Sequence, residues 1–364
     1  MKGKVKYHKL FLSMIVAVVL VVGFAFTASA SSDGPVDIAF VAPRLDITEF
    51  FGQFYDELRI TLDKAGLNYR VLEAAPPGAQ MDIEGLDHIL GDIRAFRPDY
   101  LVFVISEWHT VEPRLREIQQ EGIKMILVDN KPERTDVDPI AWILTDHVTS
   151  GYITGYAAAQ HFAAEGYKNV NVVLFHGTPG GEVGIRRMNG YVQGFDAGAK
   201  EFGFTYKIIR EVWTHFDREM AFNVAQDVGM AHPDMDLVFA ANSATALGVM
   251  EGLRNVDMLD QVRITGIGGQ LEELAAIIRG DILVSGVRLP RAQGQLAAEI
   301  LLEYIDKGGA ADIRKVNYGR QEVIWTAEDV FDTYPLMMLD YPEFRMKLPP
   351  GVWEAQIARL EKKS

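Results

Sequence analysis

The hydrophobic positions of the chain follow two alternating patterns from residue 36 to about residue 290. Runs in which nearly every residue is apolar, such as 36–42 and 100–105, predict strands that are covered on both faces. Between such runs, apolar residues recur at helical spacing, as at Phe51, Phe54 and Leu58. Alternating strands and helices are typical of parallel sheets wound with helices. The pattern predicts about ten strands, at 36–42, 69–72, 100–105, 125–128, 142–144, 171–175, 206–212, 237–240, 263–267 and 282–287.

The number of predicted strands favours two sheets over one. A single open sheet of that size is uncommon, and 364 residues suffice for two cores. We therefore expect an α/β protein with two doubly wound lobes. No low-complexity linker divides the chain, which predicts several short crossings between the lobes. Residues 334–364, rich in Pro, Met and aromatic residues, are expected to form an appended segment that packs on a lobe.

The N-terminus has the three parts of a secretory signal peptide. Four lysines precede an apolar run at 10–26, and Ala28-Ser29-Ala30 offers small residues for cleavage before Ser31. The alternative is an uncleaved anchor, because this run of 17 residues, interrupted by Ser13 and Gly23, is near the lower limit for a membrane span. The cleavage site favours a signal peptide at 1–30 and an exported, periplasmic protein. Removing four lysines from a chain of net charge −14 leaves −18.

Composition and motifs exclude several classes of function. The acidic charge disfavours nucleic-acid binding, and the absence of cysteine excludes disulfides and thiolate sites. The eight histidines form no H-E-x-x-H motif, and no serine lies in a G-x-S-x-G motif. The glycine-rich turn at 177–184 lacks a phosphate-loop pattern and is interpreted as a tight turn before a helix. We therefore expect neither an enzyme nor a cofactor or metal site.

Polar and aromatic residues gather where the predicted strands end. Ligands of open parallel sheets bind beyond the carboxyl ends of the strands, so these residues are candidates for a binding site. Carboxylate, amide and guanidinium groups can hold hydroxyl groups, and aromatic rings can cover the apolar face of a sugar. Asp146 and Ser243 are equally well explained as helix caps. The predicted ligand-binding residues are Asp46, Thr48, Phe51, Trp108, Asp129, Arg187, Phe216, Asn242 and Arg288, and whether Phe50 or Phe51 faces the cleft stays open.

Four segments resemble the type I periplasmic binding proteins, the ribose- and galactose-binding group. The segment from His232-Pro233-Asp234 to Asn242 and Gly248 is similar to a characteristic stretch of that family. The others are Ile185–Tyr191, which includes Arg187, the strand that ends at Asp129, and Phe216-Asp217-Arg218. The resemblance implies a monomeric periplasmic receptor that closes on a small hydroxylated ligand, a sugar, and delivers it to an ABC transporter permease. It also implies an N-terminal lobe of 31–145 plus 289–321, a C-terminal lobe of 146–288 plus 322–364, and crossings near Asp146, Arg288 and the 320s.

Three positions depart from the sugar-binding pattern. Asn130, Ser243 and the Gly268-Gly269 turn stand where the family usually has an arginine and two carboxylates. With these changes and with Arg288, the chain is similar to the autoinducer-2 binding protein LuxP. This similarity implies an alternative function, a ligand sensor that acts on the periplasmic domain of a membrane sensor kinase. In that case the ligand would be a furanose-type signal. Arg187 and Arg288, if both face the cleft, would suit a ligand that carries some negative charge. A secreted sugar-directed hydrolase is the alternative of another class, but no catalytic group is found for it.

Overall fold

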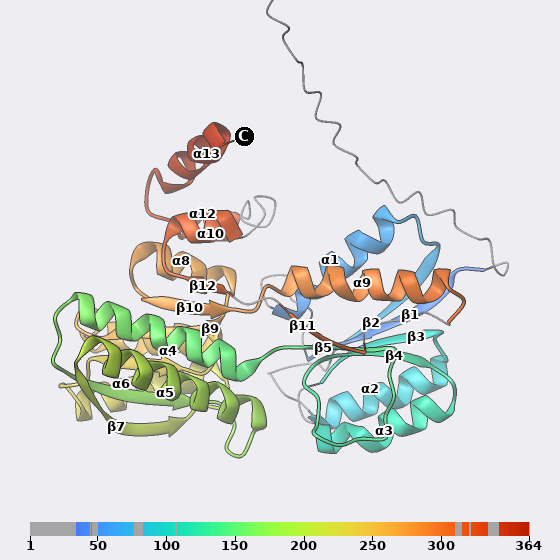
Figure 1. The fold of residues 1–364 in the computed structure, drawn as a ribbon, viewed down its shortest axis with the longest axis horizontal. Coiled ribbons are helices and arrows are strands. Elements are labelled where there is room, and N and C mark those ends of the chain that lie inside the picture. The colour runs from blue at the N-terminus through green and yellow to red at the C-terminus, as the bar shows by residue number, and fades with distance from the viewer. Residues whose placement is uncertain are drawn as a thin grey trace, which may run out of the picture. The chain divides into compact units, whose positions relative to one another are not determined.

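The first sheet is built from strands near the N-terminus and one distant strand. The computed structural model describes residues 34–43, 45, 50–75, 83–105, 108–309, 315–319, 322–333 and 342–363. The six strands lie in the order β11-β5-β4-β3-β1-β2, and every pair is parallel (Figure 1). They are β1 (Val36–Val41), β2 (Tyr69–Ala74), β3 (Tyr100–Val104), β4 (Lys124–Asp129), β5 (Ala141–Leu144) and β11 (Val316–Tyr318).

The second sheet has the same number of strands, in the order β12-β10-β9-β8-β6-β7. Its strands are parallel except for β12, which runs antiparallel to β10 at the sheet edge. They are β6 (Asn169–His176), β7 (Thr205–Trp213), β8 (Leu237–Ala240), β9 (Arg263–Gly268), β10 (Val284–Val287) and β12 (Glu322–Ile324).

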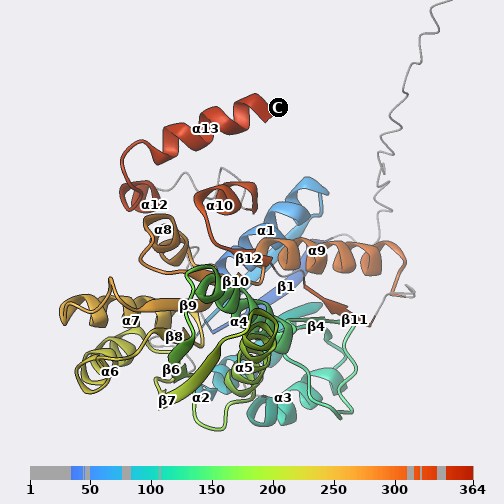
Figure 2. The same cartoon turned by 60° about the vertical axis from the view of Figure 1, so that its left-hand side comes forward.

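Helices cover both faces of each sheet, which explains why the strands are apolar throughout. In the first lobe α1 and α9 pack on one face, and α2 and α3 on the other. In the second lobe α4 and α5 pack on one face, and α6, α7 and α8 on the other, as Figure 2 shows from a second direction. The helices are α1 (Phe50–Lys64), α2 (Ile83–Phe96), α3 (Trp108–Gln120), α4 (His147–Ala164), α5 (Glu182–Phe202), α6 (Arg218–Ala231), α7 (Ser243–Asn255), α8 (Leu271–Arg279) and α9 (Pro290–Asp306).

The prediction of two doubly wound α/β lobes is confirmed. Each of the ten predicted strands is present, with ends that shift by a few residues. The chain passes from one sheet to the other after β5, after β10 and between β11 and β12. Strands β11 and β12 were not predicted, because each has only three residues and includes a polar side chain, so neither stands out as an apolar run.

Helices α4 and α5 approach so closely that their backbones touch. A β-carbon built at Gly194 would lie 2.0 Å from the carbonyl oxygen of Tyr152, and one at Gly190 would lie 2.0 Å from that of Val148. On the facing helix, a β-carbon at Gly151 would lie 2.0 Å from the carbonyl oxygen of Arg187. Only glycine allows this approach, which places the beginning of α4 against the first turns of α5.

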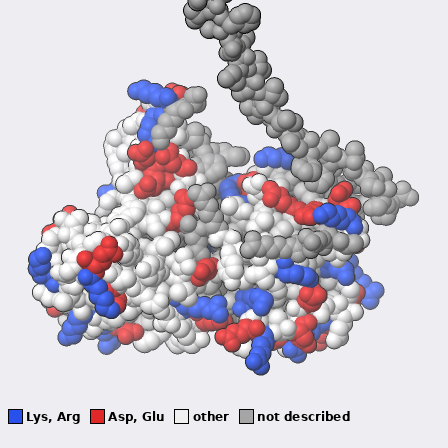
Figure 3. All heavy atoms as spheres, in the orientation of Figure 1, with Lys and Arg blue, Asp and Glu red and all other residues white. Residues whose placement is uncertain are grey.

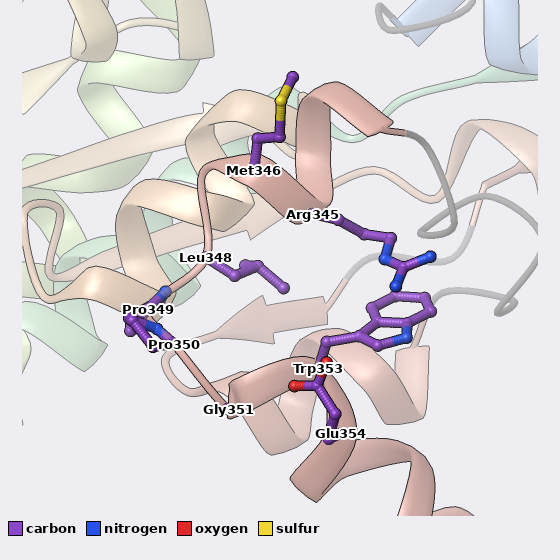
Figure 4. Close-up of a pocket in the computed structure, with 8 residues that line it drawn as sticks. All are labelled: Arg345, Met346, Leu348, Pro349, Pro350, Gly351, Trp353 and Glu354. Carbon is purple, nitrogen blue, oxygen red and sulfur yellow. The ribbon is translucent and has the colours of Figure 1, made fainter.

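The C-terminal segment packs on the second lobe, as expected. It contains α12 (Pro342–Met346) and α13 (Val352–Lys363), and it follows α10 (Ala327–Thr333). Phe344 is 2% exposed within the core of that lobe. The guanidinium of Arg345 lies 4.7 Å from the ring centre of Trp353 (Figure 4), and Lys347 Nζ lies 2.8 Å from Glu272 Oε1 on α8. The segment is therefore held by apolar and charged contacts together.

The predicted signal peptide, residues 1–30, lies outside the described residues. Among the helices that the structure describes, none is both long and apolar enough to cross a membrane. Acidic and basic side chains lie close to one another on the face drawn in Figure 3. This mixture is typical of a solvated surface.

Candidate ligand-binding site

A polar cavity of about 310 Å³ lies beyond the carboxyl ends of strands from the first sheet. Its volume is at the lower end of the range for small-molecule sites. Both lobes contribute to it, since Arg186 belongs to α5 and Asp129 to β4. The lining residues are Asp129, Asn130, Lys131, Pro132, Glu133, Leu144, Thr145, Asp146, His147, Val148, Arg186 and Tyr318.

Asp129 and Arg288 form a buried ion pair at this cavity. Asp129 ends β4 and Arg288 follows β10, and each residue is 6% exposed. Arg288 Nη1 lies 3.3 Å from Asp129 Oδ1, and the guanidinium lies 3.8 Å from the ring centre of Phe50. Asp129 has a φ of 78°, a left-handed conformation that aspartate tolerates better than most residues. The pair therefore joins a strand of the first sheet to a strand of the second.

Arg187 and His147 continue this cluster on the other side of Asp129. Arg187 lies in the first turns of α5, where it donates from Nη1 to the carbonyl oxygen of Ala241 at 2.8 Å. It also donates from Nε to His147 Nδ1 at 3.3 Å. His147, the first residue of α4, is 1% exposed, and its Nε2 lies 3.8 Å from Asp129 Oδ1. The four side chains thus form one chain of contacts, from Arg288 through Asp129 and His147 to Arg187.

Burial and mutual repulsion decide the charge states of this cluster. Burial, with repulsion from Arg187 and Arg288, lowers the pKa of His147 to about 3, although Asp129 acts in the opposite direction. Burial and repulsion from Arg288 lower the pKa of Arg187 to about 9, so Arg187 keeps its charge at neutral pH. Burial opposes the charge of Asp129, but the surrounding cationic groups hold its pKa below the ordinary value. At neutral pH the cluster holds two guanidinium ions, one carboxylate and a neutral imidazole.

The neutral state of His147 should make the protein less stable in mild acid. As the pH falls from 7.5 to 5.0, the unfolded chain takes up a proton on this histidine and the folded chain does not, which lowers the free energy of unfolding by roughly 2 kcal/mol. Denaturant melts of the wild type and His147→Gln should therefore show a difference in unfolding free energy that falls by this amount. A difference that stays constant over the same pH interval would mean that His147 has the same pKa in the folded protein as in the unfolded chain, and would contradict the lowered pKa.

The predicted residues Asn242 and Phe216 lie together at the carboxyl edge of the second sheet. Asn242 caps α7, where its Oδ1 accepts from Thr245 N at 2.9 Å, and its Nδ2 lies 3.5 Å from the carbonyl oxygen of Phe216. Phe216 is 7% exposed and has a φ of 60°. Its ring lies so close to Gly177 that a β-carbon there would be 2.1 Å away. The glycine-rich turn therefore accommodates the Phe216 ring and leads into α5.

Other predicted residues do not join the charged cluster. Trp108 is 3% exposed and packs in the core of the first lobe, with its ring centre 5.6 Å from that of Trp142. Phe51 packs partly buried against the other core of that lobe, whereas its neighbour Phe50 carries the ring that faces Arg288. Asp46 and Thr48 lie outside the described residues. The cluster therefore holds Asp129, Arg187 and Arg288 from the predicted set, with Phe50 in the place assigned to Phe51.

Two site residues were missed by the sequence analysis. His147 follows Asp146, which caps α4, and nothing in its sequence context distinguishes it from an ordinary buried histidine. Glu273 is fully buried in the first turn of α8, where its Oε2 accepts from Ser243 Oγ at 2.6 Å and from Gly269 N at 2.9 Å. Burial raises the pKa of Glu273 in spite of these hydrogen bonds. A carboxyl group thus lies next to Ser243 and Gly269, the two places where the family resemblance implies that a carboxylate is missing.

Two α/β lobes with a polar cavity beside the carboxyl ends of their strands define the class of type I periplasmic solute receptors. The chain belongs to the periplasmic binding protein domain family, whose match spans residues 38–310. The resemblance found in the sequence is therefore confirmed at the level of the family, and the more specific resemblance to LuxP stays a prediction.

Individual relatives are similar over most of their length. The ribose import binding protein RbsB of Salmonella typhimurium is 26% identical over 286 residues, which cover 79% of this chain and 90% of that protein. The D-allose-binding periplasmic protein of Escherichia coli is 21% identical over 272 residues, which cover 72% of this chain and 75% of that protein.

Solved structures share the fold at low sequence identity. A periplasmic solute binding protein of an ABC transporter from Actinobacillus succinogenes, with bound D-allose, has a TM-score of 0.70 at 21% identity. That comparison covers 82% of this chain and 99% of the other. The Caulobacter myo-inositol binding protein, bound to myo-inositol, has a TM-score of 0.66 at 20% identity. That comparison covers 84% of this chain and 98% of the Caulobacter chain. Both neighbours are covered nearly completely, so this chain has residues beyond their common fold.

Proposed function

We propose that this protein is a periplasmic receptor that binds a small hydroxylated ligand, a sugar or polyol, and delivers it to an ABC importer. The observation that carries the proposal is the buried cluster of Arg288, Asp129, His147 and Arg187 beside a cavity lined by both lobes. Charged groups that are buried in this way need partners, and hydroxyl groups are well suited to them. The ligands named for the relatives and neighbours, ribose, D-allose and myo-inositol, support this class.

Ligand-dependent closure follows from the origin of the site residues. Asp129 belongs to the first lobe, whereas Arg187 and Arg288 belong to the second. A ligand that contacts both sets of groups gains more in a closed arrangement than in an open one, and it therefore shifts the population toward closure. The closed arrangement would present one continuous surface of both lobes to the permease.

A thermal-shift screen against sugars and polyols should identify a stabilising ligand. A compound at 100 times its dissociation constant should raise the free energy of unfolding by about 2.7 kcal/mol, because it binds only the folded protein. The control is the same screen with amino acids and short peptides, which offer few hydroxyl groups. Stabilisation by the control compounds alone would contradict the proposed ligand class.

A further inference from the structure

Hydrogen-bond donors outnumber acceptors where Arg187 meets His147. Because Arg187 Nε donates to His147 Nδ1, the neutral imidazole must carry its proton on Nε2. This Nε2 is buried and has no hydrogen-bond partner among the residues that the structure describes, since Asp129 Oδ1, at 3.8 Å, is too distant. The hydrogen bonds of Arg187 use Nε and Nη1, which leaves donor capacity at Nη2. A buried N–H without an acceptor is costly unless a ligand supplies one.

Negative charge, like hydrogen-bond acceptors, is lacking around Arg187 among the described residues. The protein partners of Arg187 are a backbone carbonyl and a neutral imidazole, and none of the described carboxylates lies within ion-pairing distance of it. Asp129 is shared, since it lies 3.3 Å from Arg288 and next to His147. Glu273, the other buried carboxyl group nearby, accepts from Ser243 and Gly269 through Oε2, its Oε1 has no hydrogen-bond partner among the described residues, and it forms no ion pair with Arg187. The charge of Arg187 is therefore not balanced by any described carboxylate at ion-pairing distance.

A carboxylate satisfies both conditions better than a hydroxyl group. A hydroxyl group accepts hydrogen bonds but also has a proton to donate, so it needs an acceptor that Arg187 and His147 Nε2 do not offer. A carboxylate only accepts, forms stronger hydrogen bonds with guanidinium, and brings one negative charge.

We propose, building on the function proposed above, that Arg187 and His147 form an oxyanion subsite and that the ligand is a sugar acid, a polyhydroxylated monocarboxylate. The remaining polar groups of the cavity bind the hydroxyl groups of such a ligand. The carboxylate accepts from Arg187 Nη2 and from His147 Nε2.

Matched pairs of ligands test the charge preference directly. Calorimetric titrations at neutral pH compare D-glucuronate with D-glucose, D-galacturonate with D-galactose, and D-gluconate with D-glucitol. In at least one pair the acid should bind about tenfold or more tightly than its neutral partner, as expected for a charge-assisted hydrogen bond. Neutral members that bind as tightly as their acids would overturn the sugar-acid inference and leave the proposed function intact. If no compound bound at millimolar concentration, the proposed function would be contradicted as well.

Variants at the two donors test the subsite. Arg187→Met and His147→Met should each lower the ratio of acid affinity to neutral affinity about tenfold or more, whereas His147→Gln, which keeps an N–H donor, should retain most of it. The ratio reports on the carboxylate contact, because a general loss of packing weakens both ligands together. A ratio unchanged in both methionine variants would overturn the proposal.

The chain offers a matched control on the same helix. At the other end of α4, His161 accepts from Arg263, whose Nε lies 3.3 Å from His161 Nε2, as in the Arg187–His147 pair. His161→Met removes a histidine with the same kind of partner, away from the cavity, and should leave the ratio unchanged. Circular dichroism of each variant verifies folding, and the two substitutions at His147 keep the test decisive if Arg187→Met does not fold.

Discussion

Replacing Gly194 by alanine should destabilise the folded protein by about 3 kcal/mol or more. The added methyl group would lie 2.0 Å from the carbonyl oxygen of Tyr152, and the next two nearest atoms also belong to the Tyr152 backbone. A side chain could rotate away from such a contact, but a helix backbone cannot, so α4 and α5 must separate. Denaturant melts that are followed by circular dichroism measure the loss.

Gly91→Ala is the matched control for this substitution. Gly91 lies inside α2, and a β-carbon there has no atom within 4 Å. The same chemical change should therefore stabilise the protein by about 0.5–1 kcal/mol, through the higher helix propensity of alanine. Equal effects at both positions would contradict the close backbone contact between α4 and α5.

Replacing Asp129 by asparagine should cost about 3 kcal/mol of folding free energy. The substitution keeps the shape of the side chain and suits the left-handed backbone, but it removes the carboxylate that lies 3.3 Å from Arg288 Nη1. The buried side chains of Arg288 and Arg187 would then lose the negative charge that Asp129 places next to them. Removal of one partner from a buried ion pair is among the most destabilising single changes.

An exposed ion pair provides the comparison for Asp129. Asp138 Oδ1 lies 3.0 Å from Lys315 Nζ, a distance similar to that in the buried pair, but the Asp138 side chain is 78% exposed. Asp138→Asn should change the free energy of unfolding by less than about 1 kcal/mol, because water screens this pair. If the two substitutions had the same effect, burial of the Asp129 pair would not be the source of its contribution.

Hydrophobic periodicity predicts most of the fold, and it does not extend to the short edge strands. The strands at 36–41 and 237–240 are runs of apolar residues, and both lie where the pattern places them. By contrast, β11 and β12 have three residues each, and each adds to the edge of a sheet whose other strands come from earlier in the chain. Their pairing depends on distant segments, which a local pattern cannot reveal.

The site was predictable where topology alone determines position. Asp129 and Arg288 follow strands, so the rule on carboxyl ends of parallel sheets places them together. Trp108 also follows a strand, yet its ring turns into the core, because the direction of a side chain depends on packing. His147 and Glu273 lie in first turns of helices, where the helical pattern identifies the helix but not the contacts of a polar side chain.

The contacts of the C-terminal segment bear on how receptors of this family can be recombined. The family match ends at residue 310, but Phe344 lies in the core of the second lobe and Lys347 pairs with Glu272 on α8. A hybrid receptor that joined this lobe to the first lobe of a relative would need the chain through α13. Cut at the family boundary, the grafted lobe would expose the hydrophobic surface that Phe344 covers, and the hybrid would be prone to aggregate.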